Sequence, residues 1–247
     1  MALPALADEE IFIANASFET PDLAPGRFTS NLVPGWVGTH TDFISNFGVF
    51  HPEPENFTQP VPQGRNVVFI ERGGIHQTLT NRLQAGIVYT LSVQAGNSVF
   101  DRSSPFSVQL RAGGALLAEE VRPAVPRGIF DGVSVVFSAP ADHPALGLPL
   151  EIWLLEQDLR KSNEVYFDNV RLTAVSTVRL QIECLNGTHV VLSWPATAAD
   201  FRLQSSPVLG EGADWVPVES EVAIVNGRCV TTNELNSTKL YYRLQKP

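Results

Sequence analysis

The chain has 247 residues, of which 44% are hydrophobic and 17% charged, so it can bury a core and is not intrinsically disordered. Its formal net charge of −9 excludes a global basic surface for nucleic acid. No apolar run approaches the roughly 20 residues of a membrane helix, so membrane insertion is not expected. The 18 Gly and 18 Pro residues argue against a helical bundle.

The first nine residues form a short apolar and then acidic segment. Ala5-Leu6-Ala7 resembles the small-residue end of a secretory signal, although a basic start and a longer apolar run are missing. We expect residues 1–9 to be a leader remnant or a disordered tail. We also expect the protein to be secreted, or to lie at the cell surface or in the periplasm. In such a protein Cys184 and Cys229 could form a disulfide, or both could be buried thiols.

Alternation of apolar and polar residues predicts β-strands along most of the chain up to residue 175. After a long segment at 20–65, the predicted strands lie at 67–70, 75–79, 88–94, 106–110, 115–118, 133–137, 150–155 and 165–172. Gly113-Gly114 is a two-residue hairpin turn signal between two of them. This pattern is typical of an antiparallel sandwich or barrel.

Residues 20–65 are rich in Pro, Gly and Asn, and they predict long ordered loops. Loops of this length usually bind a ligand or pack as a lid. The alternative, which we favour, is a satellite core that fixes the loops. The side chains concerned are Trp36, Phe43, Phe47, Phe50, His51, Phe57 and Arg65.

A second β domain is predicted from residue 176 to residue 247. Its strands are expected at 177–184, 190–194, 201–205, 222–225, 228–231 and 240–244, with Asn226-Gly227 as a hairpin turn. About 70 residues suffice for a small β-sandwich.

Two sets of motifs carry resemblances to known families. The first set is Asn15-Ala-Ser-Phe-Glu19, Val33-Pro-Gly-Trp36, Gly74-Ile-His-Gln-Thr-Leu79, Gly86-Ile-Val-Tyr-Thr-Leu-Ser92 and Val165-Tyr-Phe-Asp-Asn-Val-Arg-Leu172. In this order, these motifs resemble the galactose-binding-like jelly roll of carbohydrate-binding modules, over residues 10–175. The second set is Leu192-Ser-Trp-Pro195, Phe201-Arg-Leu-Gln-Ser-Ser206, Trp215 and Tyr241-Tyr-Arg-Leu244. This set is similar to a small fibronectin- or immunoglobulin-like C-terminal domain of exported bacterial proteins, over 176–247. We therefore expect an all-β protein, a jelly-roll β-sandwich followed by a smaller β-sandwich.

The first resemblance implies a structural Ca²⁺ ion. In that family a Glu of the first motif and an Asp of the last strand bind the ion together with backbone carbonyls, and the matching residues here are Glu19 and Asp168. Oxygen ligands from distant segments suit Ca²⁺. The alternative is that these carboxylates cap turns or pair with Arg171.

The predicted strand at 150–155 carries the candidate ligand-binding face. Alternation places Leu150, Ile152 and Leu154 on one side and Glu151 and Trp153 on the other. An indole can cover the apolar face of a sugar ring while amide and guanidinium groups bind hydroxyls. The predicted partner is therefore a poly- or oligosaccharide, unless Trp153 is covered by the loops and simply packs. The predicted ligand-binding residues are Trp153, Glu151, Gln94, Gln109, Arg111, His76 and Trp36.

No catalytic residue is assigned. The sequence holds no HExxH metal motif and no GxSxG nucleophile elbow. His76 with Glu71 or Asp101 is the only acid–base pair that suggests itself, and an exposed strand histidine is the simpler interpretation. The predicted function is non-catalytic carbohydrate binding. The alternatives are a glycan-active hydrolase or lyase on the same scaffold, and a structural or adhesive surface protein.

Overall fold

The computed structural model describes residues 9–39, 46–140, 142–158, 163–176, 178–210, 212–226, 228–235 and 239–246. These residues divide into two compact units that part near Val175. Both units are built from β-strands, and the only helical segment in the described ranges is the 3₁₀ turn Ala196–Ala198. The all-β prediction is thereby confirmed. None of the described residues forms a helix long and apolar enough to cross a membrane.

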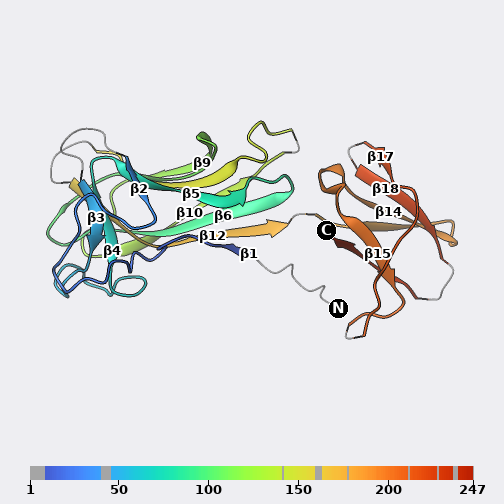
Figure 1. The fold of residues 1–247 in the computed structure, drawn as a ribbon, viewed down its shortest axis with the longest axis horizontal. Helices are drawn as coiled ribbons and strands as arrows, with labels where there is room; N and C mark the ends of the chain where they lie inside the picture. Colours follow the sequence, from blue (N-terminus) through green and yellow to red (C-terminus); the bar gives the residue numbers. More distant parts are fainter. Residues whose placement is uncertain are drawn as a thin grey trace. The chain divides into compact units, whose positions relative to one another are not determined.

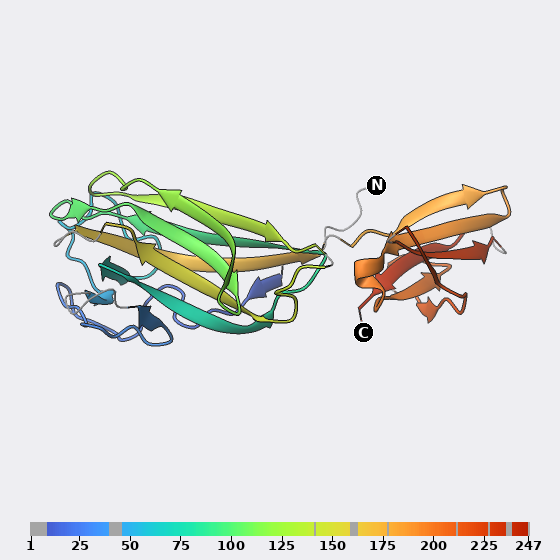
Figure 2. The same ribbon diagram turned by 90° about the horizontal axis from the view of Figure 1, so that it is seen from above.

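The first unit is a sandwich of two antiparallel sheets with the jelly-roll β fold. The sheets form two layers in Figure 1, and Figure 2 shows their strands running along the same long direction. One sheet has the order β10-β6-β12-β4-β3, and β1 and β7 also pair with β12; the other has the order β2-β5-β11-β8-β9. The strands of the first sheet are β1 (Glu9–Ile11), β3 (Asn46–Phe50), β4 (Val67–Glu71), β6 (Ile87–Gly96), β7 (Arg102–Ser103), β10 (Phe130–Ser138) and β12 (Asn163–Ser176). Those of the second are β2 (Val37–Thr39), β5 (Gly74–Arg82), β8 (Phe106–Ala112), β9 (Ala115–Arg122) and β11 (Pro149–Glu156).

The core between the sheets follows the alternation of the sequence. Leu150, Ile152 and Leu154 of β11 are fully buried, while the residues between them point to the other face. Phe106 of β8 meets Phe167 of β12 edge to face, with ring centroids 5.5 Å apart, so the two sheets interlock. Each fully buried side chain of this size contributes about 1.5–3 kcal/mol to stability.

Residues 165–168 of β12 are buried on both faces of the sheet. Phe167 points between the sheets, yet Tyr166 and Asp168 on the opposite face are 4% and 0% exposed. The reason is that side chains of the loops at residues 12–36 and 51–66 pack on this outer face. Phe57 of the second loop packs edge to face on the Tyr166 ring at 5.4 Å. The covered outer face of the seven-stranded sheet therefore has a second, smaller set of buried contacts.

The second unit has a sheet of order β13-β14-β18-β17 and another of order β16-β15-β19. Trp194 is its largest buried side chain, and the indole N–H donates to the carbonyl of Ala198 at 3.0 Å. Cys229 is buried and Cys184 exposed, and both are free thiols. The strands are β13 (Gln181–Leu185), β14 (His189–Pro195), β15 (Arg202–Ser206), β16 (Val216–Pro217), β17 (Ala223–Val225), β18 (Arg228–Glu234) and β19 (Tyr241–Gln245).

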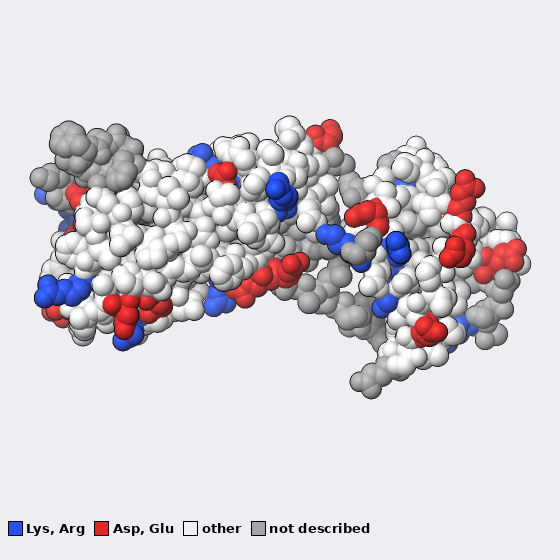
Figure 3. Space-filling model, in the orientation of Figure 1, with Lys and Arg blue, Asp and Glu red and all other residues white. Residues whose placement is uncertain are grey.

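Charged side chains are sparse on the face of the first unit that Figure 3 shows. Lys, Arg, Asp and Glu lie in small mixed groups, mostly towards the edges, and the described part of this face has no continuous basic surface. A nucleic-acid-binding surface would require such a basic area.

Candidate functional site

The outer face of the five-stranded sheet carries most of the residues predicted to bind a sugar. Trp153 lies opposite His76 on β5 and Gln109 on β8. The His76 ring stacks on the indole, with centroids 4.2 Å apart and planes 10° apart, and Arg111 Cζ lies 4.3 Å from the indole centroid. The indole N–H donates to Glu151 Oε2 at 2.9 Å. These side chains are thus engaged mainly with one another.

The charged residues of this face also act on His76, whose Nδ1 is a buried nitrogen with no hydrogen-bond partner among the described residues. Burial lowers the pKa of His76 below its usual value, the Glu151 carboxylate opposes that shift, and the Arg111 guanidinium adds to it. The neutral imidazole is therefore favoured in the stack. The Gln109 amide donates to Glu119 at 2.6 Å and accepts from Arg111 at 2.7 Å.

Two of the predicted ligand-binding residues lie elsewhere. Gln94 is on β6, which belongs to the seven-stranded sheet and pairs with β10 there. Trp36 is 7% exposed, packs against Phe18, and donates its indole N–H to the Ala14 carbonyl at 3.1 Å. The sequence shows which way a side chain points from its strand, but not which sheet the strand joins.

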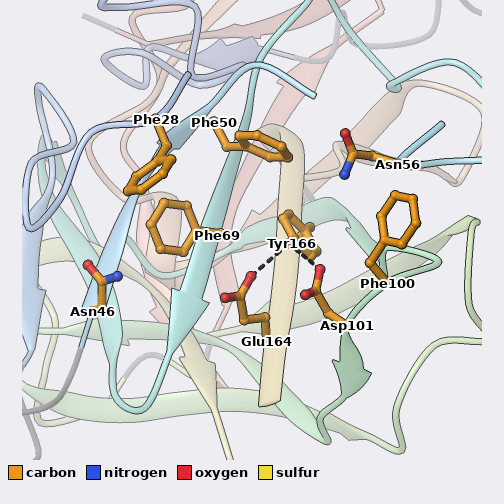
Figure 4. A pocket seen from close by; sticks show the side chains of 9 residues that line it. All are labelled: Phe28, Asn46, Phe50, Asn56, Phe69, Phe100, Asp101, Glu164 and Tyr166. Carbon is orange, nitrogen blue, oxygen red and sulfur yellow. Dashed lines mark hydrogen bonds between the residues drawn. The ribbon is translucent and has the colours of Figure 1, made fainter. Parts of the chain in front are cut away.

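A pocket of about 250 Å³ opens on the outer face of the seven-stranded sheet, where Phe28 and Asn56 come from the loops at residues 12–36 and 51–66. Its walls are mainly aromatic, with two carboxylates and two carboxamides among them, and none of the described lining residues is Lys, Arg or His. Figure 4 shows the rings around the Tyr166 side chain and the carboxylates of Glu164 and Asp101 on either side of its hydroxyl. The lining residues are Phe28, Asn46, Phe50, Asn56, Phe69, Phe100, Asp101, Glu164 and Tyr166.

Three oxygen atoms form the polar centre of this pocket. Tyr166 Oη lies 2.7 Å from Asp101 Oδ2 and 2.6 Å from Glu164 Oε2. Glu164 and Tyr166 are two residues apart on β12, so both point to the same face of the sheet. Asp101 comes from the loop between β6 and β7.

The loop that carries Asp101 is fixed on both sides. Val99 N–H donates to the Asn56 carbonyl at 2.9 Å, and the buried Asn97 amide donates to the Val125 carbonyl at 3.2 Å. Directly after Asp101, β7 pairs in parallel with β12 at Asn163 and Glu164. This pairing brings the two carboxylates together from positions far apart in the sequence.

Glu164 is an unusually weak acid in this setting. Burial raises its pKa to about 7, and the negative charges of Asp101 and Glu71 add to that rise, whereas the hydrogen bond from Tyr166 opposes it. Burial also raises the pKa of the Tyr166 hydroxyl, which therefore stays protonated. A carboxyl group with a pKa near neutrality can act as a general acid at physiological pH.

The two predicted calcium ligands do converge on one loop. Glu19 Oε1 accepts the N–H groups of Arg65 and Asn66, both at 2.9 Å, and Asp168 Oδ2 accepts the Gln63 N–H at 2.7 Å. Between these donors lies Gly64 at a φ of +70°, where a Cβ atom would collide with the Glu19 carboxylate.

The donor chemistry of this loop fits a hard cation. Burial raises the pKa of Asp168 to about 8, and the nearby charge of Glu19 adds to the rise, whereas the N–H groups of Gln63 and Asn169 lower it. Asn66 Oδ1 is a buried oxygen without a hydrogen-bond partner among the described residues. Within the same described ranges, no cluster of three or more His, Cys, Asp or Glu side chains could hold a metal ion.

Reasoning from sequence missed most of the pocket. It named Asp101 only as a partner of His76, but His76 lies on the outer face of the five-stranded sheet. Phe50 was assigned to loop packing, and it both packs on Tyr166 and lines the pocket. Phe43 lies outside the described residues. The available signal was Glu164, a carboxylate that directly precedes the predicted strand at 165–172 and shares a side of it with Tyr166 and Asp168.

Comparison with known proteins gives one sequence family and several similar structures. Residues 9–173 match the model of the HpiC1-like family, described as HpiC1 cyclase. No curated protein sequence matches the chain. A Stig cyclase, Fisc from Fischerella sp. TAU, in complex with (3Z)-3-(1-methyl-2-pyrrolidinylidene)-3H-indole is 31% identical, with a TM-score of 0.63 over 69% of this chain and 99% of that one. A Fischerella sp. TAU cyclase in complex with 4-(1H-indol-3-yl)butan-2-one is 32% identical, with a TM-score of 0.61 over 68% and 98%.

These matches correct the functional predictions. Non-catalytic carbohydrate binding is wrong, because the sequence family and the similar structures are cyclases. The predicted oligosaccharide partner is wrong as well, because those structures contain small indole compounds. The resemblance to galactose-binding-like modules holds only for the jelly-roll fold, and a fold of this kind hosts unrelated functions. The physical reason for the error is that the indole, amide and guanidinium groups around Trp153, a composition expected of a sugar-binding face, contact one another within the sheet.

Proposed function

Because the chain belongs to the HpiC1-like cyclase family, we propose that it catalyses the acid-promoted cyclisation of a small aromatic molecule in the pocket around Tyr166. One observation carries the proposal: Glu164, with a pKa of about 7, sits in a pocket walled mainly by phenylalanines, and the described lining residues include no cationic side chain. This is a proton donor in surroundings that suit a cationic intermediate.

The substrate we propose is an indole derivative. Two similar cyclases were crystallised with indole compounds, and a pocket of about 250 Å³ suits one small molecule rather than a sugar chain. Phe28 and Phe100 are 61% and 65% exposed, so they present ring surface to an incoming ligand. Phe69, 5% exposed, closes the base of the pocket next to Phe28, at a centroid distance of 5.9 Å.

The proposed reaction begins with proton transfer from the Glu164 carboxylic acid to the ring nitrogen of a 3H-indole. Protonation makes the adjacent ring carbon electrophilic, and the electron pair of a pendant alkene then forms the new carbon–carbon bond. The resulting carbocation loses a proton to a carboxylate of the pocket. One proton enters and one leaves, so the product is an isomer of the substrate, and no oxidant or reductant is consumed.

The chain's own side chains would favour this path in two ways. Aromatic faces attract a cation that lies over them, by about 0.5–2 kcal/mol each, so Phe28, Phe50 and Phe69 would stabilise the charged intermediate. The same rings exclude water, which would otherwise capture the carbocation. The Asp101 carboxylate adds a negative charge beside the developing positive charge.

We further propose that Glu19 and Asp168 hold a structural Ca²⁺ ion, together with oxygen atoms of the loop at residues 63–66. The proposal is supported by two carboxylates that contact one loop, one of them fully buried, and by Asn66 Oδ1, a buried oxygen with no hydrogen-bond partner among the described residues. Such an ion would supply only charge neutralisation and cross-linking of the first motif to β12. It would fix the loops at residues 12–36 and 51–66 relative to β12. The second unit would be an accessory module of an exported protein.

Indole binding and isomer formation test the proposed activity. The probe 4-(1H-indol-3-yl)butan-2-one should raise the melting temperature of the full chain and bind saturably in calorimetry. A 3H-indole with a pendant alkene should give a cyclised product of unchanged mass. Glu164→Gln should abolish turnover while it retains probe binding, and Trp153→Phe on the opposite sheet should change neither. If the wild-type chain neither binds the probe nor forms an isomer, the proposed function is wrong.

A further inference from the structure

The polar centre of the pocket has more acceptors than its one hydroxyl group can serve. Tyr166 Oη is within 2.7 Å of both Asp101 Oδ2 and Glu164 Oε2, but a hydroxyl carries a single hydrogen. Two short O···O contacts of this kind need two hydrogens. The second one must belong to a carboxyl group, because two ionised carboxylates so close to each other repel. The three oxygens therefore share two hydrogens and one negative charge.

The surroundings decide which carboxyl group keeps its proton. Glu164 has two negative neighbours, since Glu71 follows Ile70 on β4, and Ile70 pairs with Val165 next to Glu164. Among the described residues, the titratable groups that act on Glu164 are Asp101 from the β6–β7 loop, Glu71 from β4 and Tyr166 from β12 itself.

We propose that Asp101 is a positioning residue of this site: it takes the hydroxyl hydrogen of Tyr166 and so leaves Glu164 as the carboxyl group that carries the reactive proton. The inference rests on the proposed function, because it assigns the acid of that reaction. When Glu164 gives up its proton, the Tyr166 hydroxyl turns from Asp101 to the new carboxylate and donates to it. One hydrogen thus serves Asp101 before proton transfer and Glu164 after it.

The arrangement makes two opposite predictions for the pKa of Glu164. Asp101→Asn removes a negative charge and keeps the shape of the side chain, so it should lower that pKa by about one unit. Tyr166→Phe removes the donor that stabilises the ionised form of Glu164, so it should raise the pKa. If Asp101 and Tyr166 had a purely structural role, the Glu164 pKa would not fall in one variant and rise in the other.

The titration can be measured without any substrate, and its outcome is therefore separate from that of the proposed activity. Side-chain carboxyl carbons are followed by NMR in the full chain, and the Glu164 signal is identified by its loss in Glu164→Gln. We expect the wild-type signal to titrate near pH 7, and to move lower in Asp101→Asn and higher in Tyr166→Phe. Asp101→Ser provides a second variant without the charge, and Asp101→Glu should restore the wild-type value.

A matched control is Asp131→Asn on β10, an exposed carboxylate that accepts only the N–H of Gly132 among the described contacts, and it should leave the titration unchanged. If the Glu164 signal does not move in Asp101→Asn and Asp101→Ser, or moves to higher pH, the role of Asp101 is refuted. With active enzyme, the alkaline limb of kcat/KM should move by the same amounts. An inactive wild type with the expected NMR shifts would refute the proposed function alone.

Discussion

Tyr166 and Asp101 are 65 residues apart in the sequence, yet the hydroxyl oxygen of one lies 2.7 Å from a carboxylate oxygen of the other. The contact joins the first part of β12 to the loop before β7, on the outer face of the seven-stranded sheet. Side chains of the loops at residues 12–36 and 51–66 pack on that face, so a phenol and two carboxylates are held together in a partly buried pocket.

Replacement of the acid should separate chemistry from binding. Glu164→Gln keeps the size and hydrogen-bonding capacity of the side chain but cannot donate an acidic proton. We expect the rate of cyclisation to fall by about 10²- to 10⁴-fold, the usual contribution of general acid catalysis. Affinity for 4-(1H-indol-3-yl)butan-2-one should change by less than about threefold, measured by calorimetry. A variant with wild-type turnover would show that another group donates the proton.

The pH dependence of the reaction should follow the same group. An acid catalyst must be protonated, so kcat/KM should be high below pH 7 and should fall as the pH rises through the Glu164 pKa of about 7. The fall should be about tenfold per pH unit above that point, as expected for a single ionisation. A profile that is flat between pH 6 and pH 8 would contradict the assignment.

The same carboxyl group should cost stability at alkaline pH. The pKa of Glu164 is about 7 in the folded protein against an ordinary value of 4.5 in an unfolded chain, so its stabilising protonation is fully present below pH 4.5 and is lost as the pH rises through 7. Glu164→Gln should therefore have a higher melting temperature than wild type at pH 8, by a few degrees, and an equal one near pH 4.5. A difference independent of pH would point to altered packing instead.

Two aromatic walls of the pocket should respond differently to truncation. Phe69 is 5% exposed within the buried cluster, so Phe69→Ala should lower the free energy of unfolding by about 3–5 kcal/mol. Phe28 is 61% exposed, so Phe28→Ala should leave stability within about 1 kcal/mol of wild type and weaken indole binding. Urea unfolding and calorimetry measure the two effects. Equal loss of stability in both variants would contradict this division.

Removal of calcium should destabilise the first unit. An ion at a hundredfold excess over its Kd adds about 2.7 kcal/mol, which corresponds to roughly 5–10 °C in a domain of this size. Excess EDTA should lower the melting temperature accordingly in wild type, and Asp168→Asn should abolish the difference. Asp131→Asn lies away from the loop at residues 63–66, so this variant should still have a lower melting temperature in EDTA. A wild-type melting temperature that is insensitive to EDTA would remove the proposed ion.

Some residue positions could be predicted from the sequence and others could not. Period-two alternation correctly placed Leu150, Ile152 and Leu154 inside, with Glu151 and Trp153 outside, because side-chain direction along a strand is a local property of the backbone. The convergence of Glu19 and Asp168 on one loop was also anticipated, through the resemblance. The contacts of the Trp153 face were not anticipated. Composition cannot distinguish polar side chains that bind one another from polar side chains that bind a ligand.

The sequence by itself therefore determined the strands, the class of fold and the sidedness of each strand, since these depend on neighbours a few residues apart. Only the tertiary structure decided that β6 and β11 belong to different sheets, that residues 165–168 of β12 are buried on both faces, and that Asp101 meets Tyr166 and Glu164. The pocket depends on strand pairing and loop coverage between residues up to 138 positions apart, from Phe28 to Tyr166. Such pairings depend on the packing of the whole sandwich, so no local pattern encodes them.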